Sequence, residues 1–439
     1  MKKMLSCFCA VSASVMFAFA ETDAEGFVSL FNGKDLTGWV GNGPIGDSYK
    51  VAEDGTLYCD PKGKGSGKLL TEKEYENFVL RFEFQLTENA NNGLGIRCPI
   101  DGDAAYNGME LQILDNTGSN YTKLHEYQYH GSIYGVVPAR RNFLKPVGEW
   151  NFQEVRAVGS RITVMLNGAI IVDADIGGIT KTMDGRDHPG LHNAKGHIGW
   201  LGHGYKVSWR NIRIKEVPAN YTLTGPQDNH APEGFTCLFN GKDLTNWKGV
   251  TRLERFDNPF VRQAATPEKR AEIQKQADSL LPGHWSVREG ILRFEDWDKK
   301  GYSLATVKDY KDFEILVDWR ILSVRGDSGL YLRGCPQVQI WDAHNQWHIG
   351  SGGLYNNKKP ENPSNALLIA DNLVGSWNHF RIKMVGEKVS VWLNDKLVVD
   401  NVTLENYWDR SKPVPPIEQI ELQCHGDPLE FKNIYIREL

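Results

Sequence analysis

The sequence lacks the features by which several classes of protein are recognised. It contains no run of Lys and Arg, and acidic and basic residues are mixed along the chain to a net charge of −5. Because nucleic-acid-binding proteins carry clustered basic residues, this pattern argues against a nucleic-acid partner. After residue 20 no apolar run approaches the roughly 18 residues that a membrane-spanning helix needs. We therefore expect no membrane span in the mature chain.

Cysteine is also scarce. Five cysteines follow residue 20 at wide spacings: Cys59, Cys98, Cys237, Cys335 and Cys424. This spacing matches neither the Cys-x-x-Cys pairs of a zinc site nor the dense pattern of a disulfide-rich domain. We interpret these cysteines as small buried apolar residues, in a chain long enough to bury two cores without cross-links.

The first 20 residues have the pattern of a cleavable signal peptide. A basic start is followed by an apolar stretch of about nine residues, and Ala18-Phe19-Ala20 has the A-x-A form of a cleavage site. Cys7 and Cys9 come too early to serve as lipoprotein attachment sites. We predict a signal peptide over residues 1–20 and a secreted or periplasmic mature chain from Glu21.

Four sequence blocks occur twice, in the same order. "LFNGKDLTGW" at Leu30 returns as "LFNGKDLTNW", "NNGLGIRC" as "DSGLYLRG", "EWNFQEVRAV" as "SWNHFRIKMV", and "WRNIRIKEV" as the closing "FKNIYIREL". A repeat of this length indicates two copies of a domain of about 200 residues, not a short solenoid unit. We predict a first domain at 21–217, a turn-rich linker at 218–234 and a second domain at 235–439.

Each copy has the pattern of short β-strands. Segments such as "NFVLRFEFQL" and "FEILVDWRIL" alternate or run apolar and are rich in Val, Ile, Phe and Trp. Asn167-Gly168 between two apolar runs predicts a tight hairpin. We predict an all-β chain of two tandem β-sandwiches. One helix, over Thr266–Leu281, is expected as an insertion in the second domain, because Thr266 and Pro267 form an N-terminal cap signal.

Alternation along the strands of the second copy separates an apolar face from a polar one. Apolar residues alternate with long hydrogen-bonding and aromatic side chains in "GLYLR", "QVQIWD" and "IELQCHG". Flat rings and bidentate amides suit the faces and hydroxyls of a sugar. The residues predicted to share the polar face are Tyr331, Arg333, Gln337, Gln339, Trp341, Glu421, Gln423 and His425.

The first copy repeats this polar face with substitutions. Arg97, Gln112 and His203 match Arg333, Gln339 and His425 of the second copy. The carboxylates do not match: Glu110 aligns with Gln337, and Gly199 aligns with Glu421. Because the polar stripe is unbroken in the second copy, we expect unequal copies, with more turnover in the second.

Other polar residues are open to a structural interpretation. Asp115 and Asp342 fall on the core side of their strands, which favours roles as strand-end caps. Histidines also lie in loops, where they are either surface residues or metal ligands, and their spacing matches no familiar metal site. These loop histidines are His125, His130, His344 and His348.

The repeated blocks resemble the 3-keto-disaccharide hydrolase family over nearly the whole mature chain. The resemblance rests on "LFNGKDLTGW", "DSGLYLRG", "PQVQIWD", "GMELQILD", "HGSIYGV", "GEWN" and "CHGDPLEFKNIYIREL". It implies concanavalin A-like jelly-roll sandwiches. It also implies substrates whose C3 hydroxyl has already been oxidised to a ketone by a separate sugar 3-dehydrogenase.

That substrate class implies a mechanism of elimination followed by hydration. A C3 ketone acidifies the C2 proton, so a base removes it, the enediolate expels the C1 substituent, and water adds back. The implied base is a histidine, His203 or His425, or a carboxylate, Glu110 or Glu421. Arg97 and Arg333 are the expected enolate stabilisers.

The expected sugar-binding residues are Gln112, Tyr134, Tyr331, Gln337, Gln339, Trp341, Tyr355 and Gln423. The sequence leaves open whether a divalent metal cation assists. Two alternative functions also stay open: an ordinary endoglycosidase of the same fold, and a tandem carbohydrate-binding protein without catalysis.

Overall fold

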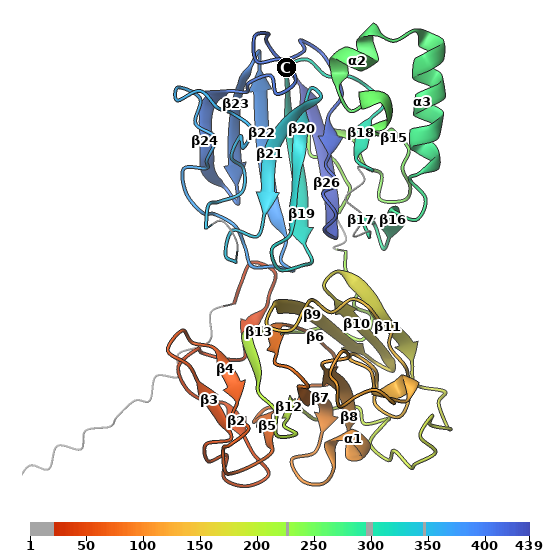
Figure 1. Cartoon of the computed structure of the whole chain (residues 1–439), viewed down its shortest axis with the longest axis vertical. Coiled ribbons are helices and arrows are strands. Elements are labelled where there is room, and N and C mark those ends of the chain that lie inside the picture. The colour runs from red at the N-terminus through yellow and green to blue at the C-terminus, as the bar shows by residue number, and fades with distance from the viewer. Residues whose placement is uncertain (1–21, 225–227, 296–301, 346–347) are drawn as a thin grey trace, which may run out of the picture.

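The computed structural model describes residues 22–224, 228–295, 302–345 and 348–439. The predicted signal peptide lies outside these residues. The chain forms two β-sandwich domains stacked along the long axis of the molecule (Figure 1), which confirms the predicted fold class. All pairings within the four named sheets are antiparallel, as expected for a jelly roll.

The first domain contains a larger and a smaller sheet. The strands of the larger sheet are β1 Val28–Ser29, β3 Tyr49–Val51, β4 Leu57–Cys59, β6 Phe78–Leu86, β9 Trp150–Val158, β10 Arg161–Leu166, β11 Ala169–Asp175 and β13 Val207–Glu216. Those of the smaller sheet are β2 Trp39–Val40, β5 Lys68–Thr71, β7 Asn91–Cys98, β8 Met109–Leu114 and β12 His197–Leu201. Their spatial orders are β11-β10-β9-β6-β13-β4-β3, with β1 beside β13, and β2-β5-β12-β7-β8.

The second domain repeats this arrangement. The strands of its larger sheet are β14 Thr236–Cys237, β16 Trp285–Arg288, β17 Ile291–Phe294, β19 Phe313–Ile321, β22 Asn378–Val385, β23 Lys388–Leu393, β24 Lys396–Thr403 and β26 Leu429–Glu438. Those of its smaller sheet are β15 Trp247–Gly249, β18 Leu304–Thr306, β20 Asp327–Leu332, β21 Cys335–Trp341 and β25 Glu421–Leu422. Their orders, β24-β23-β22-β19-β26-β17-β16 with β14 beside β26, and β15-β18-β25-β20-β21, correspond strand for strand to the first domain.

Strand alternation builds a separate core in each sandwich. In β6 the side chains of Phe78, Leu80, Phe82 and Phe84 are buried between the sheets, whereas Arg81 faces the other way. A second cluster fills the other sandwich. The predicted hairpin at Asn167 is present: Leu166 pairs with Ala169, and both turn residues have positive φ, as a type I′ turn requires.

The helices lie outside the sheets. The predicted insertion is confirmed as α3 Pro267–Ser279, whose N-cap Thr266 accepts a hydrogen bond from the N–H of Lys269. Four short elements carry no signal that predicted them: α1 Ala104–Asn107, α2 Pro259–Ala264 and the 3₁₀ turns η1 Glu126–Gln128 and η2 Leu253–Arg255. In the described ranges, no helix is long and apolar enough to cross a membrane.

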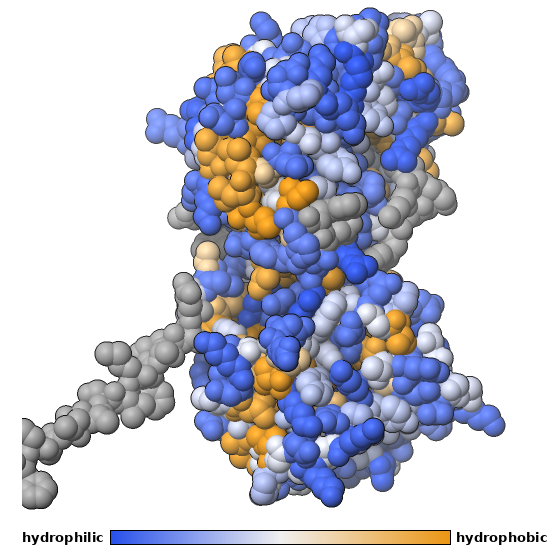
Figure 2. Space-filling model, turned by 60° about the vertical axis from the view of Figure 1, so that its left-hand side comes forward, coloured by the Kyte–Doolittle hydropathy of each residue, from blue (hydrophilic) through white to orange (hydrophobic). Residues whose placement is uncertain are grey.

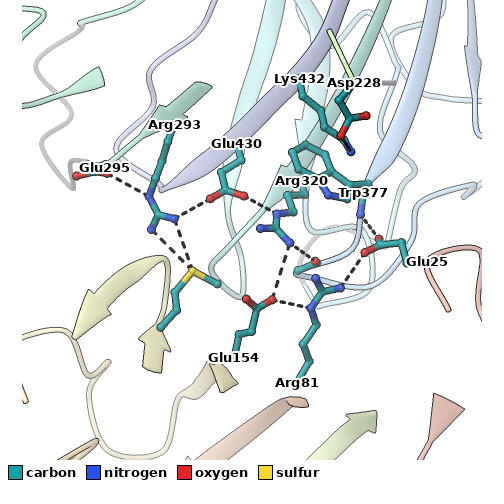
Figure 3. Close-up of polar contacts among 12 residues, drawn as sticks. Glu25, Arg81, Glu154, Asp228, Arg293, Glu295, Arg320, Trp377, Glu430 and Lys432 are labelled. Carbon is teal, nitrogen blue, oxygen red and sulfur yellow. Dashed lines mark hydrogen bonds and ion pairs between the residues drawn. The ribbon is translucent and has the colours of Figure 1, made fainter. Parts of the chain in front are cut away.

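A chain of buried charges joins the two domains (Figure 3). Arg81 contacts Glu154 at 2.8 Å in the first domain, and Glu154 lies 3.8 Å from Arg320 of the second. Arg320 and Arg293 both bind Glu430, at 2.5 and 2.7 Å. Burial opposes ionisation of Glu154, but Arg81 and Arg320 outweigh it and lower its pKa to about 2.

Apolar residues complete this interface. Phe152 and Met165 of the first domain form one buried cluster with Leu322, Val324 and Val374 of the second. The interface therefore contains apolar packing as well as paired charges.

Away from the interface, Figure 2 shows apolar side chains gathered on the β24 side of the second domain.

Candidate functional site

The smaller sheet of the first domain carries a carboxylate above a patch of glycines. Core residues alternate in β8 with Glu110 and Gln112, which face away from the sandwich interior. Glu110 pairs in register with Gly95 of β7. A Cβ atom at Gly93 would lie 2.0 Å from Glu110 Oε1, so only glycine at this position leaves room for the carboxylate.

His203 is the ionisable partner of this carboxylate. It follows the end of β12, and its Nε2 lies 3.7 Å from Glu110 Oε1. The Glu110 side chain is buried, whereas that of His203 is 50% exposed. The contact with Glu110 raises the pKa of His203, against the opposing effect of burial. Among the described residues Glu110 Oε1 accepts no hydrogen bond, so one buried carboxylate oxygen is left for a ligand.

Tyr134 and Gln112 lie on the same face as Glu110. The N–H of Tyr134 donates to the carbonyl of Glu110 at 2.9 Å, and Leu111 bridges to Ile133 on the core side. Alternation therefore puts the Tyr134 side chain beside Glu110. Gln112 donates to Asn91 at 3.1 Å. The first domain thus brings together four of the predicted residues: Glu110, Gln112, Tyr134 and His203.

A cation that the sequence analysis did not identify lies beside Tyr134. Arg186 donates to the phenol oxygen of Tyr106, and its guanidinium lies 4.7 Å from the centre of that ring. Burial raises the pKa of Tyr106, the bond to Arg186 opposes this rise, and the neighbouring Tyr134 phenol adds to it. The loop holding Arg186 is fixed by His188, which contacts Asp184 at 3.1 Å, and by the N–H of Asp184, which donates to Gly135.

Arg97 and Arg333 do not lie where alternation predicted. Arg97 lies near the end of β7 and Arg333 directly after β20, and both have φ of 50°, which breaks the strand alternation. The Arg97 guanidinium donates to the carbonyl oxygens of Glu76 and Gly159 at 2.8 Å. Arg333 donates in the same way to the carbonyls of Pro416 and Gly386. These buried side chains hold loops together, which corrects the prediction that they share a face with the carboxylates.

In the second domain, amides occupy the equivalent face. Gln337 stands at the position of Glu110 and donates to Gln339, which in turn donates to Asp327 at 2.6 Å. Gln423 donates to the Tyr331 phenol at 3.3 Å. A Cβ atom at Gly329 would lie 3.2 Å from both Gln337 and Gln423, so these amides gather over a glycine as Glu110 does.

Glu421 belongs to the same face, but its side chain is enclosed. It pairs with Ala305 and Tyr331 on the flanking strands and is 1% exposed. Gln419 donates to it at 2.7 Å, and Arg262 of α2 lies 3.7 Å away. Burial raises the pKa of Glu421, and Arg262 opposes the rise. Helix α2, which has no counterpart in the first domain, therefore contributes the cation next to this carboxylate.

Comparison with known proteins identifies the family. A model of the 3-keto-alpha-glucoside-1,2-lyase-like domain matches residues 26–215 and again residues 234–437. The chain belongs to this family. A 3-keto-disaccharide hydrolase from Bacteroides thetaiotaomicron is 26% identical, and the match covers 44% of this chain and 79% of the relative.

Solved structures with similar chains come from Parabacteroides distasonis, where they are provisionally named glycosyl hydrolases. One is 30% identical, with a TM-score of 0.38, and the match covers 44% of this chain and 99% of that one. Another is 25% identical, with a TM-score of 0.40, and the match covers 44% and 95%. Each of these matches covers less than half of this two-domain member of the family.

The remaining predicted residues lie near the polar face of the second domain and differ in how exposed their side chains are. Trp341 is buried and donates from its indole N–H to Ile349 at 2.6 Å, so its ring is not open for stacking. Tyr355 is 45% exposed and meets Trp341 edge-on. His425 lies 3.5 Å from Asp327. Sugar stacking on this face is therefore available to Tyr355 but not to Trp341.

The loop histidines and strand-end aspartates have local roles. Asp115 accepts the N–H groups of Asn89 and Thr117, and Asp342 accepts that of Arg325, as expected for caps. His130 is buried against Phe84, and burial lowers its pKa to about 4. Across the described parts of the chain, no three His, Cys, Asp or Glu side chains gather as they would around a metal ion.

Proposed function

We propose that the protein hydrolyses the glycosidic bond of 3-keto-disaccharides, or of related 3-keto-glycosides, on the smaller sheet of its first domain. The proposal is supported by family membership and by the name of the Bacteroides relative. The observation that carries the assignment to this face is the buried Glu110 carboxylate above glycines. Its Oε1 accepts no hydrogen bond from the described residues and lies 3.7 Å from the ionisable His203.

The chemistry follows from the position of the ketone. The C3 carbonyl acidifies the C2 proton, so a carboxylate suffices as base, and Glu110 takes this proton. The electron pair left on C2 delocalises onto the C3 oxygen as an enediolate, and then expels the C1 oxygen while a C1–C2 double bond forms. His203, whose raised pKa keeps more of it protonated, donates a proton to the departing oxygen.

Addition of water then completes hydrolysis. Water adds its oxygen at C1, a proton returns to C2, and the product is the free 3-keto sugar. Arg186 and the phenols of Tyr106 and Tyr134 are candidate donors for the enediolate oxygen. Arg186 binds Tyr106, Tyr134 is a neighbour of both, and the backbone of Tyr134 pairs with Glu110. The proposal assigns no step to Arg97, because its guanidinium is already bound to three loop carbonyls.

The polar groups of the second domain favour sugar binding without catalysis. Gln337 replaces Glu110, and a neutral amide cannot accept the C2 proton at neutral pH. The buried Gln423 Oε1 has no partner among the described residues and faces the same glycine as Gln337. We propose that this amide face binds a sugar without reacting with it, so that the second domain holds substrate for the first.

A pair of chromogenic substrates tests the proposed reaction. The mature protein is assayed on a 3-keto-glucoside and on its unoxidised parent, with release of the chromophore as the readout. We expect turnover of the keto sugar only, because the parent has no acidic C2 proton. Turnover of the parent would support an ordinary glycosidase instead. Binding of either sugar without turnover would support a purely carbohydrate-binding protein.

The proposed reaction also requires that the C3 hydroxyl of the sugar is oxidised to a ketone before hydrolysis. Since the ketone is not a feature of ordinary disaccharides, a separate sugar 3-dehydrogenase must supply the substrate. The predicted signal peptide implies that both reactions take place outside the cytoplasm.

A further inference from the structure

Each domain has an equivalent groove, and the two grooves differ in whether linker residues occupy them. In each, the groove lies among the turn of the "LFNG" block, a hairpin glycine and a bulge in the last strand. In the first domain these parts are Gly33, Gly55 and Asn211, and they line a cavity of about 690 Å³. In the second domain the equivalent parts are Gly241, Gly290 and Asn433.

Asp228 and Asn229 of the linker occupy the groove of the second domain. The backbone N–H of Asn229 donates to Asn433 Oδ1 at 2.6 Å, and the Asn433 N–H donates back to Asn229 Oδ1 at 3.1 Å. Asn229 Nδ2 donates to the carbonyl of Gly290 at 2.8 Å. The preceding residue, Asp228, contacts Lys432 at 2.8 Å. The Asp-Asn dipeptide is thus bound through the backbone and side-chain amide of Asn229 and through the carboxylate of Asp228.

The same receiving groups are present in the first domain. Asn211 has φ of 52° against 53° at Asn433, and its Nδ2 donates to Glu83 as that of Asn433 donates to Asp318. Within the described residues, Asn211 Oδ1 has no hydrogen-bond partner of the kind that Asn229 supplies in the second domain. Arg210 stands at the position of Lys432, but it binds Glu83 at 2.7 Å.

Two further polar groups of this cavity are buried without a hydrogen-bond partner among the described residues. They are the Nε of Arg213, which is 8% exposed, and the Oγ of Ser376 on the second domain. Both residues line the cavity. Unpartnered buried donors are uncommon and costly, so a ligand with acceptor oxygens would stabilise this cleft.

We infer that the cleft between the domains is a binding site for an extended polypeptide segment that presents an acidic residue followed by asparagine. The peptide N–H and side-chain oxygen of the asparagine pair with Asn211, its amide N–H₂ donates to the carbonyl of Gly55, and the acid faces Arg213. This function is separate from the proposed hydrolysis, since Glu110 and its neighbours do not line the cavity.

A synthetic peptide with the sequence of residues 224–234, TGPQDNHAPEG, provides the probe. It is titrated by calorimetry into the chain without residues 1–20. We expect one peptide per chain, and at least tenfold weaker binding of a control peptide in which Asn is replaced by Ala. Absence of saturable binding of the original peptide would overturn the inference.

Variants locate the bound peptide. Asn211→Gly keeps a residue that tolerates positive φ and removes only the side chain, and we expect at least a tenfold loss of affinity. Arg213→Met should also weaken binding. The matched change Asn433→Gly should leave the affinity of the first-domain cleft unchanged. Peptide binding that is insensitive to both first-domain changes would refute the assignment, as would equal sensitivity to Asn433→Gly.

Discussion

The two domains share their strand order but differ in which polar groups stand on the smaller sheet. The first presents the Glu110 carboxylate, whose Oε1 accepts no hydrogen bond from the described residues, and the half-exposed His203. The second presents amides in the same place and encloses its own carboxylate, Glu421, beside Arg262. One fold therefore supports two chemical surfaces, and the inserted helices influence only the second.

On this difference we propose that the first domain does most of the turnover, although the unbroken polar stripe predicts more turnover in the second. An unbroken polar stripe is visible in the sequence, but the sequence does not reveal that Gln419 and Arg262 occupy it. Glu421 accepts a hydrogen bond from Gln419 and is buried. It is therefore poorly placed to accept a proton from substrate, because a general base must reach that proton directly.

The largest expected effect is that of Glu110→Gln. The change keeps the shape of the side chain but gives the first domain the amide of the second. We expect kcat/KM on a 3-keto-glycoside to fall by about 10²–10⁴, the usual contribution of a general base. The melting temperature should change little, because Glu110 Oε1 accepts no hydrogen bond from the described residues. Activity within twofold of wild type would remove Glu110 from the mechanism.

Substitutions of Arg186 and Arg97 separate a role in catalysis from a role in stability. Arg186→Gln should lower kcat by roughly 10²-fold if its cation stabilises the enediolate. Arg97→Met should instead lower the free energy of unfolding by about 1–3 kcal/mol, because buried loop carbonyls lose their donors. Steady-state kinetics and thermal melting of both variants make the comparison. The reverse pattern would restore the role in catalysis that alternation predicted for Arg97.

The first domain should fold without the second, but less stably. It has its own core, so residues 21–224 should give β-type circular dichroism and a cooperative melt. The fragment also exposes Phe152 and Met165, which are buried against the second domain in the whole chain. We therefore expect its melting temperature to be several degrees lower. A non-cooperative melt would mean that the domains are one folding unit.

The pH dependence of His203 reports on its contact with Glu110. Glu110 raises the pKa of His203, so the protonated form persists to higher pH in the wild type. A step that needs this proton should slow as pH rises through the raised pKa. In Glu110→Gln the NMR titration of the His203 ring should move to lower pH. An unchanged midpoint would show that the two groups do not interact in solution.

The smallest expected effect on turnover is that of Glu421→Gln. If the second domain only holds substrate, kcat should stay within about twofold, with any change confined to KM. The enclosed site should tolerate the amide, because burial already disfavours the charged form of Glu421. A loss of kcat as large as that of Glu110→Gln would place the chemistry in the second domain after all.

Local patterns were sufficient for much of the fold. Alternation in the segment from Phe78 to Leu86 assigned its core face correctly, because a strand has only two faces. Asn167-Gly168 specified its turn, and Thr266 the start of α3, since both depend on a few adjacent residues. The same reasoning brought Glu110, Gln112 and His203 onto one sheet.

What the sequence determined by itself is therefore the fold and the polar face of each sheet, whose causes are local. Only the tertiary structure decided which side chains are available on that face. Positive φ at Arg97 and Arg333 turned both arginines toward loop carbonyls. Arg186 reached Tyr106 from a position 80 residues away along the chain. Contacts between residues distant in sequence leave no periodic signal, so alternation could not predict them.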